Sequence, residues 1–241
     1  MKVTLSKIDW DSAFFNFRVG RIEGAINTEK DLRNIESLME ENNIELSYYS
    51  TLNQLSSCLS ESNKLDIHLV DKKVTYTKSI NSELITHKSI AVIDQKTPHK
   101  NKLIHLAIQS GVYSRFNIDK RIGKEKFKEL YGIWIKKSLD RKISKEVLGF
   151  KENNELAGFV TLGEKNKRGD IGLIAVDYDF RGKGIGKTLM KSAEKWFSNL
   201  GYSLIQVVTQ KDNIPACRLY ESCGYDIEST EFFYHFWKKK D

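Results

Sequence analysis

Long apolar runs are absent from this chain of 241 residues, and none approaches the roughly 20 residues needed to cross a bilayer. The stretch from Met1 to Trp10 likewise lacks the apolar segment of a secretory signal peptide. Cysteine is scarce, and Cys58, Cys217 and Cys223 form no Cys-x-x-Cys pair. An odd number of isolated cysteines predicts free thiols in a reducing compartment rather than a disulfide framework. We therefore expect a cytoplasmic protein that does not bind a membrane.

Metal-ligand patterns, repeats and low-complexity segments are absent as well. His68 and His87 are isolated, and the five histidines show no ligand spacing, so no metal site is expected. The net charge of +7 raises the question of nucleic-acid binding. However, the lysines are spread along the whole chain beside 32 acidic residues, which favours a solvated surface and no nucleic-acid partner. A net positive charge also attracts anionic small molecules.

The length exceeds one typical domain of about 150 residues, and the hydrophobic fraction of 40% is ample for a packed core. The chain predicts an α/β protein with a small N-terminal domain over residues 1–87 and a second domain over residues 88–241. Aromatic residues crowd the segment from Trp10 to Phe17, which predicts a core or domain-interface cluster. The other elements expected in the first domain are strands at Val19–Ala25 and Ile44–Thr51, one or two strands within Leu65–Lys78, and helices at Thr28–Asn43 and Ser56–Asn63.

The second domain is expected to contain an antiparallel meander, because polar turn residues at 152–154 and 165–169 separate strand-like segments. Residues 111–119 predict a polar and aromatic loop. The elements expected in this domain are strands at Ile90–Ile93, Ile143–Lys151, Glu155–Leu162, Asp170–Val176, Leu204–Thr209 and within Tyr225–Trp237, and helices at Lys100–Ser110 and Lys124–Leu139.

The strongest local signal is a glycine-rich turn, Arg181-Gly182-Lys183-Gly184-Ile185-Gly186, between an apolar strand and a helical pattern. Glycine permits positive φ and a close approach of the backbone to a ligand. The first amides of a helix have no partner within the helix and favour phosphate oxygens. The basic residues around the glycines favour such a role over a purely structural corner. The Walker loop and the dinucleotide fingerprint fit poorly, since Leu189 stands where the fingerprint requires a further glycine.

The spacing Arg-x-x-Gly-x-Gly after an apolar strand resembles the acyl-CoA loop of the GCN5-related N-acetyltransferase (GNAT) superfamily. A second block, from Asn213 to Tyr225, is similar to the family's pattern Asn-x-x-Ala-x-x-Leu-Tyr-x-x-x-Gly-Phe/Tyr. The resemblance covers roughly residues 89–241. It implies a mixed, largely antiparallel sheet that is flanked by helices and splayed at a bulge, where acyl-CoA binds.

The resemblance also implies roles for particular residues. The chain would transfer an acyl group from acyl-CoA to an amine, with Tyr220 as the acid that protonates the leaving thiolate. No general base is evident. The family commonly has proline where this chain reads Asp177 to Phe180, which concerns the stiffness of the turn only. The residues expected to contact acyl-CoA are Ile174, Ala175, Val176, Arg181, Gly182, Lys183, Gly184, Ile185, Gly186, Lys187 and Asn213.

Three further segments, 8–15, 114–116 and 228–234, resemble the bacterial TDP-fucosamine acetyltransferases. This narrower likeness implies a dTDP-linked 3- or 4-amino-dideoxy-hexose as acceptor and a role in surface polysaccharide (O-antigen or capsule) biosynthesis. The donor would be acetyl-CoA or 3-hydroxybutyryl-CoA. Arg115 and Phe116 would lie near the sugar nucleotide, since guanidinium suits phosphate and an aromatic ring suits a base. A surface ion pair is the alternative role for Arg115.

Two functions of other kinds stay open. One is an N-acetyltransferase that acts on a ribosomal protein or a protein N-terminus. The other is a non-catalytic module that binds CoA or nucleic acid. The oligomeric state is open too, with a homodimer as one option.

Overall fold

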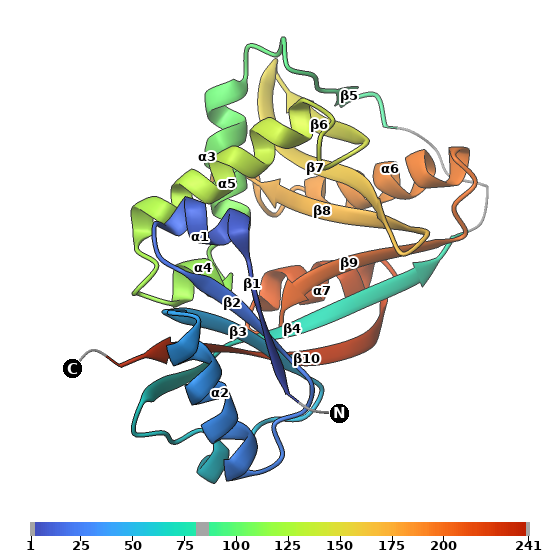
Figure 1. The fold of residues 1–241 in the computed structure, drawn as a ribbon. Coiled ribbons are helices and arrows are strands. Elements are labelled where there is room, and N and C mark those ends of the chain that lie inside the picture. The colour runs from blue at the N-terminus through green and yellow to red at the C-terminus, as the bar shows by residue number, and fades with distance from the viewer. Residues whose placement is uncertain (1–2, 81–86, 240–241) are drawn as a thin grey trace. The chain divides into compact units, whose positions relative to one another are not determined.

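The computed structural model describes residues 3–80 and 87–239, and Figure 1 shows its helices and strands. The described residues group into two compact units. The first unit runs up to Lys73 and resumes at Thr230, and the second unit is Val74–Ser229. Strands β4 (Leu65–Ser79) and β10 (Asp226–Lys238) therefore each belong to both units. The predicted domain boundary after residue 87 directly follows the undescribed residues 81–86 and stays a prediction.

In the first unit, strands β1, β2, β3, β10 and β4 are neighbours in this order. The pairing of β2 with β3 is parallel, and those of β1 with β2 and of β3 with β10 are antiparallel. The remaining elements of this unit are β1 (Thr4–Lys7), α1 (Asp9–Phe15), β2 (Val19–Glu23), α2 (Glu29–Glu41), β3 (Leu46–Thr51) and the 3-10 turn η1 (Ser57–Leu59). The predicted short helix at 56–63 is thus reduced to one 3-10 turn.

Helix α2 begins where its sequence predicts. Thr28 caps it, because the Thr28 hydroxyl accepts from the Asp31 amide and the Asp31 carboxylate accepts from the Thr28 amide. Leu32, Ile35 and Met39 lie on one face and are buried in the core of the first unit.

The aromatic segment at the beginning of the chain forms helix α1 and a chain of ring contacts within the first unit. Trp10 stacks on Phe14 at 5.1 Å, and Phe15 packs on Phe17 at 5.7 Å. Phe17 in turn lies 5.2 Å from Trp237 of β10. The sequence predicts the cluster but not α1 or β1, since both elements are too short to show a period.

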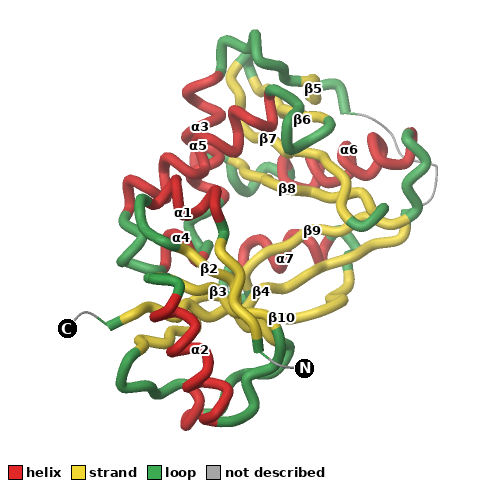
Figure 2. Tube along the Cα trace, in the orientation of Figure 1, coloured by secondary structure: helices red, strands yellow, loops and turns green. Residues whose placement is uncertain are grey.

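In the second unit, strands β4, β9, β8, β7, β6 and β5 are neighbours in this order, and helices flank the strands (Figure 2). All pairs from β5 to β8 are antiparallel, so the predicted meander is confirmed, whereas β8 and β9 are parallel. The elements are β5 (Ile90–Val92), α3 (Lys100–Ser110), α4 (Arg115–Ile118), α5 (Lys124–Leu139), β6 (Glu146–Glu152), β7 (Glu155–Lys165), β8 (Arg168–Val176), η2 (Tyr178–Phe180), α6 (Ile185–Asn199), β9 (Leu204–Gln210) and α7 (Ile214–Ser222).

Two features of this unit position the site. The turns of the meander have positive φ at Asn153–Asn154 and at Asn166–Lys167, the conformation that a tight two-residue hairpin requires. The apolar face of α6, including Ile185, Leu189 and Phe197, is buried in the same core as strand residues of β7, β8 and β9. Helix α6 is thereby held against the sheet directly after the glycine-rich turn. The predicted loop at 111–119 contains the short helix α4.

Candidate functional site

Strand β8 changes its pairing in the middle. Gly172 and Leu173 of β8 together face one residue of β7, Thr161, so β8 carries a β-bulge at this point. The pairing of β8 with β9 ends at Ile171 and Val207, and the two strands diverge beyond it (Figure 1). The bulge and the splay that the family resemblance implies are therefore present.

The register determines which backbone groups of β8 face the splay. The Asp177 amide donates to the Ala157 carbonyl at 2.9 Å, which makes Gly158 and Val176 a pair without mutual hydrogen bonds. By alternation, Ile174 and Val176 direct their N–H and C=O groups away from β7, and Ala175 directs its own toward β7. Of the three residues expected to pair with acyl-CoA through their backbone, Ile174 and Val176 are thus oriented for it and Ala175 is not.

The glycine-rich turn, which we call the acyl-CoA loop (Arg181–Lys187), leaves its backbone accessible. Gly182 and Gly184 both have φ +79, and a Cβ at either position would meet nothing within 4 Å. Gly184 is the N-cap of α6, so the amides of the first turn of α6 lack partners within the helix. The loop therefore presents backbone amides and the positive end of a helix dipole to open space, which suits a pyrophosphate.

Neighbouring residues hold two basic side chains of the loop, Arg181 and Lys183, in place. The Arg181 guanidinium stacks on the Tyr178 ring at 3.8 Å, and its Nε donates to the Val176 carbonyl at 3.1 Å. The Lys183 ammonium lies 3.0 Å from Glu152, and Lys187 is exposed. Because Arg181 occupies the Val176 carbonyl, the groups directed into the splay that remain for a ligand are the Val176 amide and both backbone groups of Ile174.

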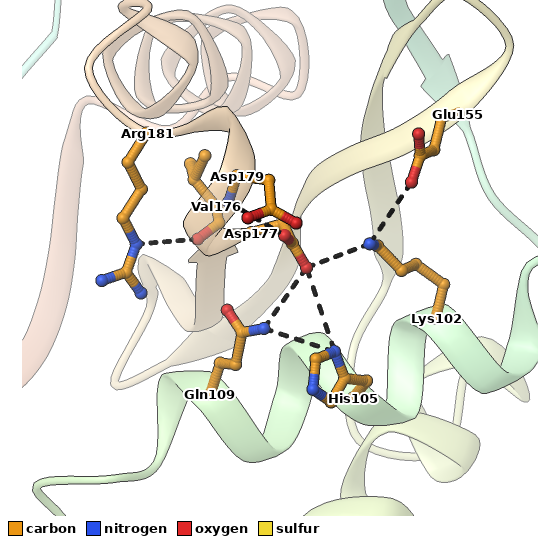
Figure 3. Close-up of polar contacts among 8 residues, drawn as sticks. All are labelled: Lys102, His105, Gln109, Glu155, Val176, Asp177, Asp179 and Arg181. Atoms are coloured by element: carbon orange, nitrogen blue, oxygen red, sulfur yellow. Dashed lines mark hydrogen bonds and ion pairs between the residues drawn. The ribbon is translucent and has the colours of Figure 1, made fainter.

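Asp177 is a buried residue whose side chain connects the loop to α3 (Figure 3). The sequence interpretation treats it only as part of a turn. It is 3% exposed. Its carboxylate lies 3.0 Å from the Lys102 ammonium and accepts hydrogen bonds from Gln109 at 3.3 Å and from the Asp179 amide at 3.2 Å. Lys102 and Gln109 stand about two helical turns apart on one side of α3, but nothing local in the sequence joins them to a residue so far along the chain.

The charges of Asp177 and Lys102 stabilise each other. Burial raises the pKa of Asp177, but the hydrogen bonds from Lys102 and the Asp179 amide and the Lys102 charge outweigh it, so the pKa lies below its usual range. The hydrogen bond to Asp177 in turn raises the pKa of Lys102. Both groups are therefore ionised at neutral pH. Where the family commonly has a proline, this chain holds the turn by an ion pair between the buried Asp177 and the half-buried Lys102.

Tyr220 lies on α7, which packs against the loop. Its neighbour Leu219 contacts the first turn of α6, since a Cβ on Gly186 would come within 3.2 Å of the Leu219 side chain. Tyr220 is 3% exposed, and its ring lies 5.5 Å from that of Tyr76. Burial, reinforced by neighbouring thiols, raises the pKa of Tyr220. The phenol is therefore protonated at neutral pH, as a general acid must be.

Asn213 acts as the N-cap of α7. Its side-chain oxygen accepts from the Ala216 amide at 3.3 Å, and its side-chain nitrogen lies 3.3 Å from the Thr209 hydroxyl. This role positions Tyr220 seven residues further on. Contact between Asn213 and acyl-CoA stays a prediction.

Arg115 and Phe116 lie on α4. The Phe116 ring is 6% exposed, packs edge-on against Trp134 at 5.9 Å and lies under the Arg115 guanidinium at 4.4 Å. The ring is therefore part of the packing between α4 and α5 and not an open platform. Its contact with a sugar nucleotide stays a prediction, as does that of Arg115.

Two further features are absent from residues 3–80 and 87–239. No cluster of three or more His, Cys, Asp or Glu side chains there could hold a metal ion. None of the helices in these ranges is long and apolar enough to span a bilayer.

Comparison with known proteins agrees with this geometry. Residues 112–225 match the acetyltransferase (GNAT) family. The fold is similar to that of a GCN5-related N-acetyltransferase from Sphaerobacter thermophilus, with a TM-score of 0.59 at 11% identity over 100% of this chain and 78% of that one. A functionally unknown protein from Staphylococcus epidermidis has a TM-score of 0.63 at 14% identity, over 93% of this chain and 85% of that one. The family match, the fold and the site geometry together indicate a GNAT-type acetyltransferase domain around residues 112–225.

Three individual relatives are more similar to this chain in sequence than these structures are. The chain is 24% identical to the dTDP-fucosamine acetyltransferase of Escherichia coli over 97% of this chain and 98% of that protein. It is 25% identical to the spore coat polysaccharide biosynthesis protein SpsD of Bacillus subtilis, over 58% of this chain and 48% of that protein. It is 34% identical to a streptothricin acetyltransferase of Escherichia coli, over 34% of this chain and 47% of that protein. The chain thus spans about half the length of the last two relatives.

A valine at Gly184 tests the loop. We expect Gly184→Val to raise the Kd of CoA at least tenfold, because it places a branched side chain at positive φ where the backbone must approach the pyrophosphate. Gly201→Val is the matched control, since Gly201 has φ +81, meets nothing within 4 Å and follows the other end of α6. Isothermal titration calorimetry measures both affinities. Equal affinities for the two variants would contradict the role of the loop.

Proposed function

We propose that the protein is an N-acyltransferase that moves an acetyl or 3-hydroxybutyryl group from acyl-CoA to the amino group of a dTDP-linked 3- or 4-amino-dideoxy-hexose. The donor is supported by the loop amides, the splayed β8 and the GNAT family match. The acceptor is supported by the likeness to dTDP-fucosamine acetyltransferase, which extends over 97% of this chain. The polysaccharide context is supported by SpsD as well.

The first task of the site is to place two reactants. The acyl-CoA loop binds the pyrophosphate, and the backbone of Ile174 and Val176 pairs with the pantetheine arm. The thioester then lies near the bulge, where a neutral amine attacks its carbonyl carbon. Holding both reactants at attack distance supplies a large part of the acceleration.

The second task is to assist the leaving group. As the new carbon–nitrogen bond forms and the carbon–sulfur bond breaks, Tyr220 donates its proton to the thiolate. Its raised pKa keeps that proton on the phenol until negative charge develops on the leaving sulfur. The amine loses a proton to solvent, and Tyr220 is reprotonated.

The pair of His105 and Asp177 does not serve as the base. The His105 Nδ1 lies 3.9 Å from the Asp177 carboxylate, an arrangement that superficially resembles a catalytic dyad. However, Asp177 lies four residues beyond Leu173, which is about 13 Å along an extended strand. Both groups are therefore remote from the thioester, and they act on the loop.

Tyr220→Phe tests the acid. We expect kcat to fall about 100-fold or more while the Kd of acyl-CoA changes little, because only proton donation is lost. Tyr225→Phe is the control, as it removes another hydroxyl from the same core, 6.4 Å away between ring centroids. Steady-state kinetics of thiol release gives kcat, and a kcat for Tyr220→Phe similar to the control would remove the assignment.

An acceptor screen tests the whole proposal. Thiol release is measured with acetyl-CoA and 3-hydroxybutyryl-CoA against dTDP-linked 3-amino and 4-amino sugars, streptothricin and N-terminal peptides. We expect turnover with one dTDP-amino sugar to exceed that with streptothricin or peptide at least 100-fold. If streptothricin or a peptide were turned over and no dTDP-amino sugar were, the proposed acceptor would be wrong. Binding of CoA without turnover of any acceptor would favour a non-catalytic module.

A further inference from the structure

We propose that Thr161 is a positioning residue that sets the place of the bulge in β8 and thereby decides which backbone groups face acyl-CoA. This inference rests on the proposed use of the splay as the site for the pantetheine arm. It concerns a residue of β7, outside the two sequence blocks that carry the family resemblance.

The Thr161 hydroxyl replaces a ladder partner at the bulge. The Leu173 amide donates to the Thr161 Oγ1 at 2.7 Å, although two residues of β8 share one partner residue here. Thr161 is 3% exposed and Leu173 is half-buried, so this hydrogen bond is partly shielded from water. An amide that is shielded from water and loses its partner destabilises the fold, which makes this register the favourable one.

Gly172 provides the space for that hydroxyl. A Cβ at residue 172 would lie 2.8 Å from the Thr161 Oγ1, closer than side chains tolerate. The φ of Gly172 is not in the left-handed region, so the requirement for glycine at this position is one of space and not of backbone conformation. Thr161 and Gly172 therefore fit each other as a pair, and either substitution disturbs the same contact.

The consequence of losing this contact follows from strand periodicity. If the bulge were lost and β8 slipped by one residue, Ile174 would pair with Phe159 in place of Val160. The N–H and C=O groups of Ile174 and Val176 would then point toward β7, and those of Leu173 and Ala175 would face the splay. The backbone groups that β8 offers to the pantetheine arm would then be shifted by one residue relative to the loop that holds the pyrophosphate.

The test compares Thr161→Val, which keeps the shape and removes the hydroxyl, with Thr161→Ser, which retains it. We expect Thr161→Val to raise the Kd of CoA about tenfold and Thr161→Ser to leave it within about twofold. Thr75→Val, at a buried threonine of β4 in the same unit, is the control for the loss of a hydroxyl. Gly172→Ala is a second route to the same effect if Thr161→Val does not fold.

The register is read directly in the protein without ligand. Val160 and Ile174 are a pair without mutual hydrogen bonds, with Cα atoms about 4.5 Å apart, so their Hα protons give a strong nuclear Overhauser effect. We expect this signal to persist in Thr161→Ser and to weaken in Thr161→Val and Gly172→Ala.

The two readouts separate the two proposals. Wild-type protein that fails to bind CoA would remove the proposed function, while the Val160–Ile174 signal would still report whether Thr161 sets the register. Wild-type affinity together with an unchanged Val160–Ile174 signal in Thr161→Val would overturn the inference.

Discussion

Unpaired peptide groups are the constraint on which this site depends. A strand that loses its neighbour and a helix that begins both leave N–H groups without partners inside the fold, and each such group must find a ligand, a side chain or water. The second unit places the two situations in succession, since β8 parts from β9 at Ile171 and α6 begins at Ile185. One extended, phosphate-bearing molecule can satisfy both, and acyl-CoA has that form.

Side chains around these groups serve mainly to hold the backbone. Arg181 donates to the Val176 carbonyl, Asp177 ties the turn to Lys102 of α3, and Asn213 caps the helix that carries Tyr220. An ion pair with one buried partner is costly to break, because the buried charge is then left uncompensated. The use of one here, at the turn between strand and loop, is consistent with a need for a rigid backbone more than for stability.

Much of the fold could be predicted from local signals, since α5 occupies the range expected from its apolar face and the glycine turn lies between strand and helix as expected. What could not be predicted depends on residues that are distant in sequence. The pairing of Asp177 with Lys102 is not visible in any periodicity of the sequence. The bulge is a one-residue shift that strand patterns do not reveal, so only the family resemblance implied it. Phe116 shows the converse difficulty, because an aromatic residue in a polar segment can equally be packing.

The most direct measurement is a crystal structure of the protein with CoA. The account predicts pyrophosphate oxygens within hydrogen-bond distance of the amides of the acyl-CoA loop, and pantetheine amides paired with the backbone of Ile174 and Val176. A pyrophosphate bound elsewhere, with the loop amides facing only solvent, would contradict it.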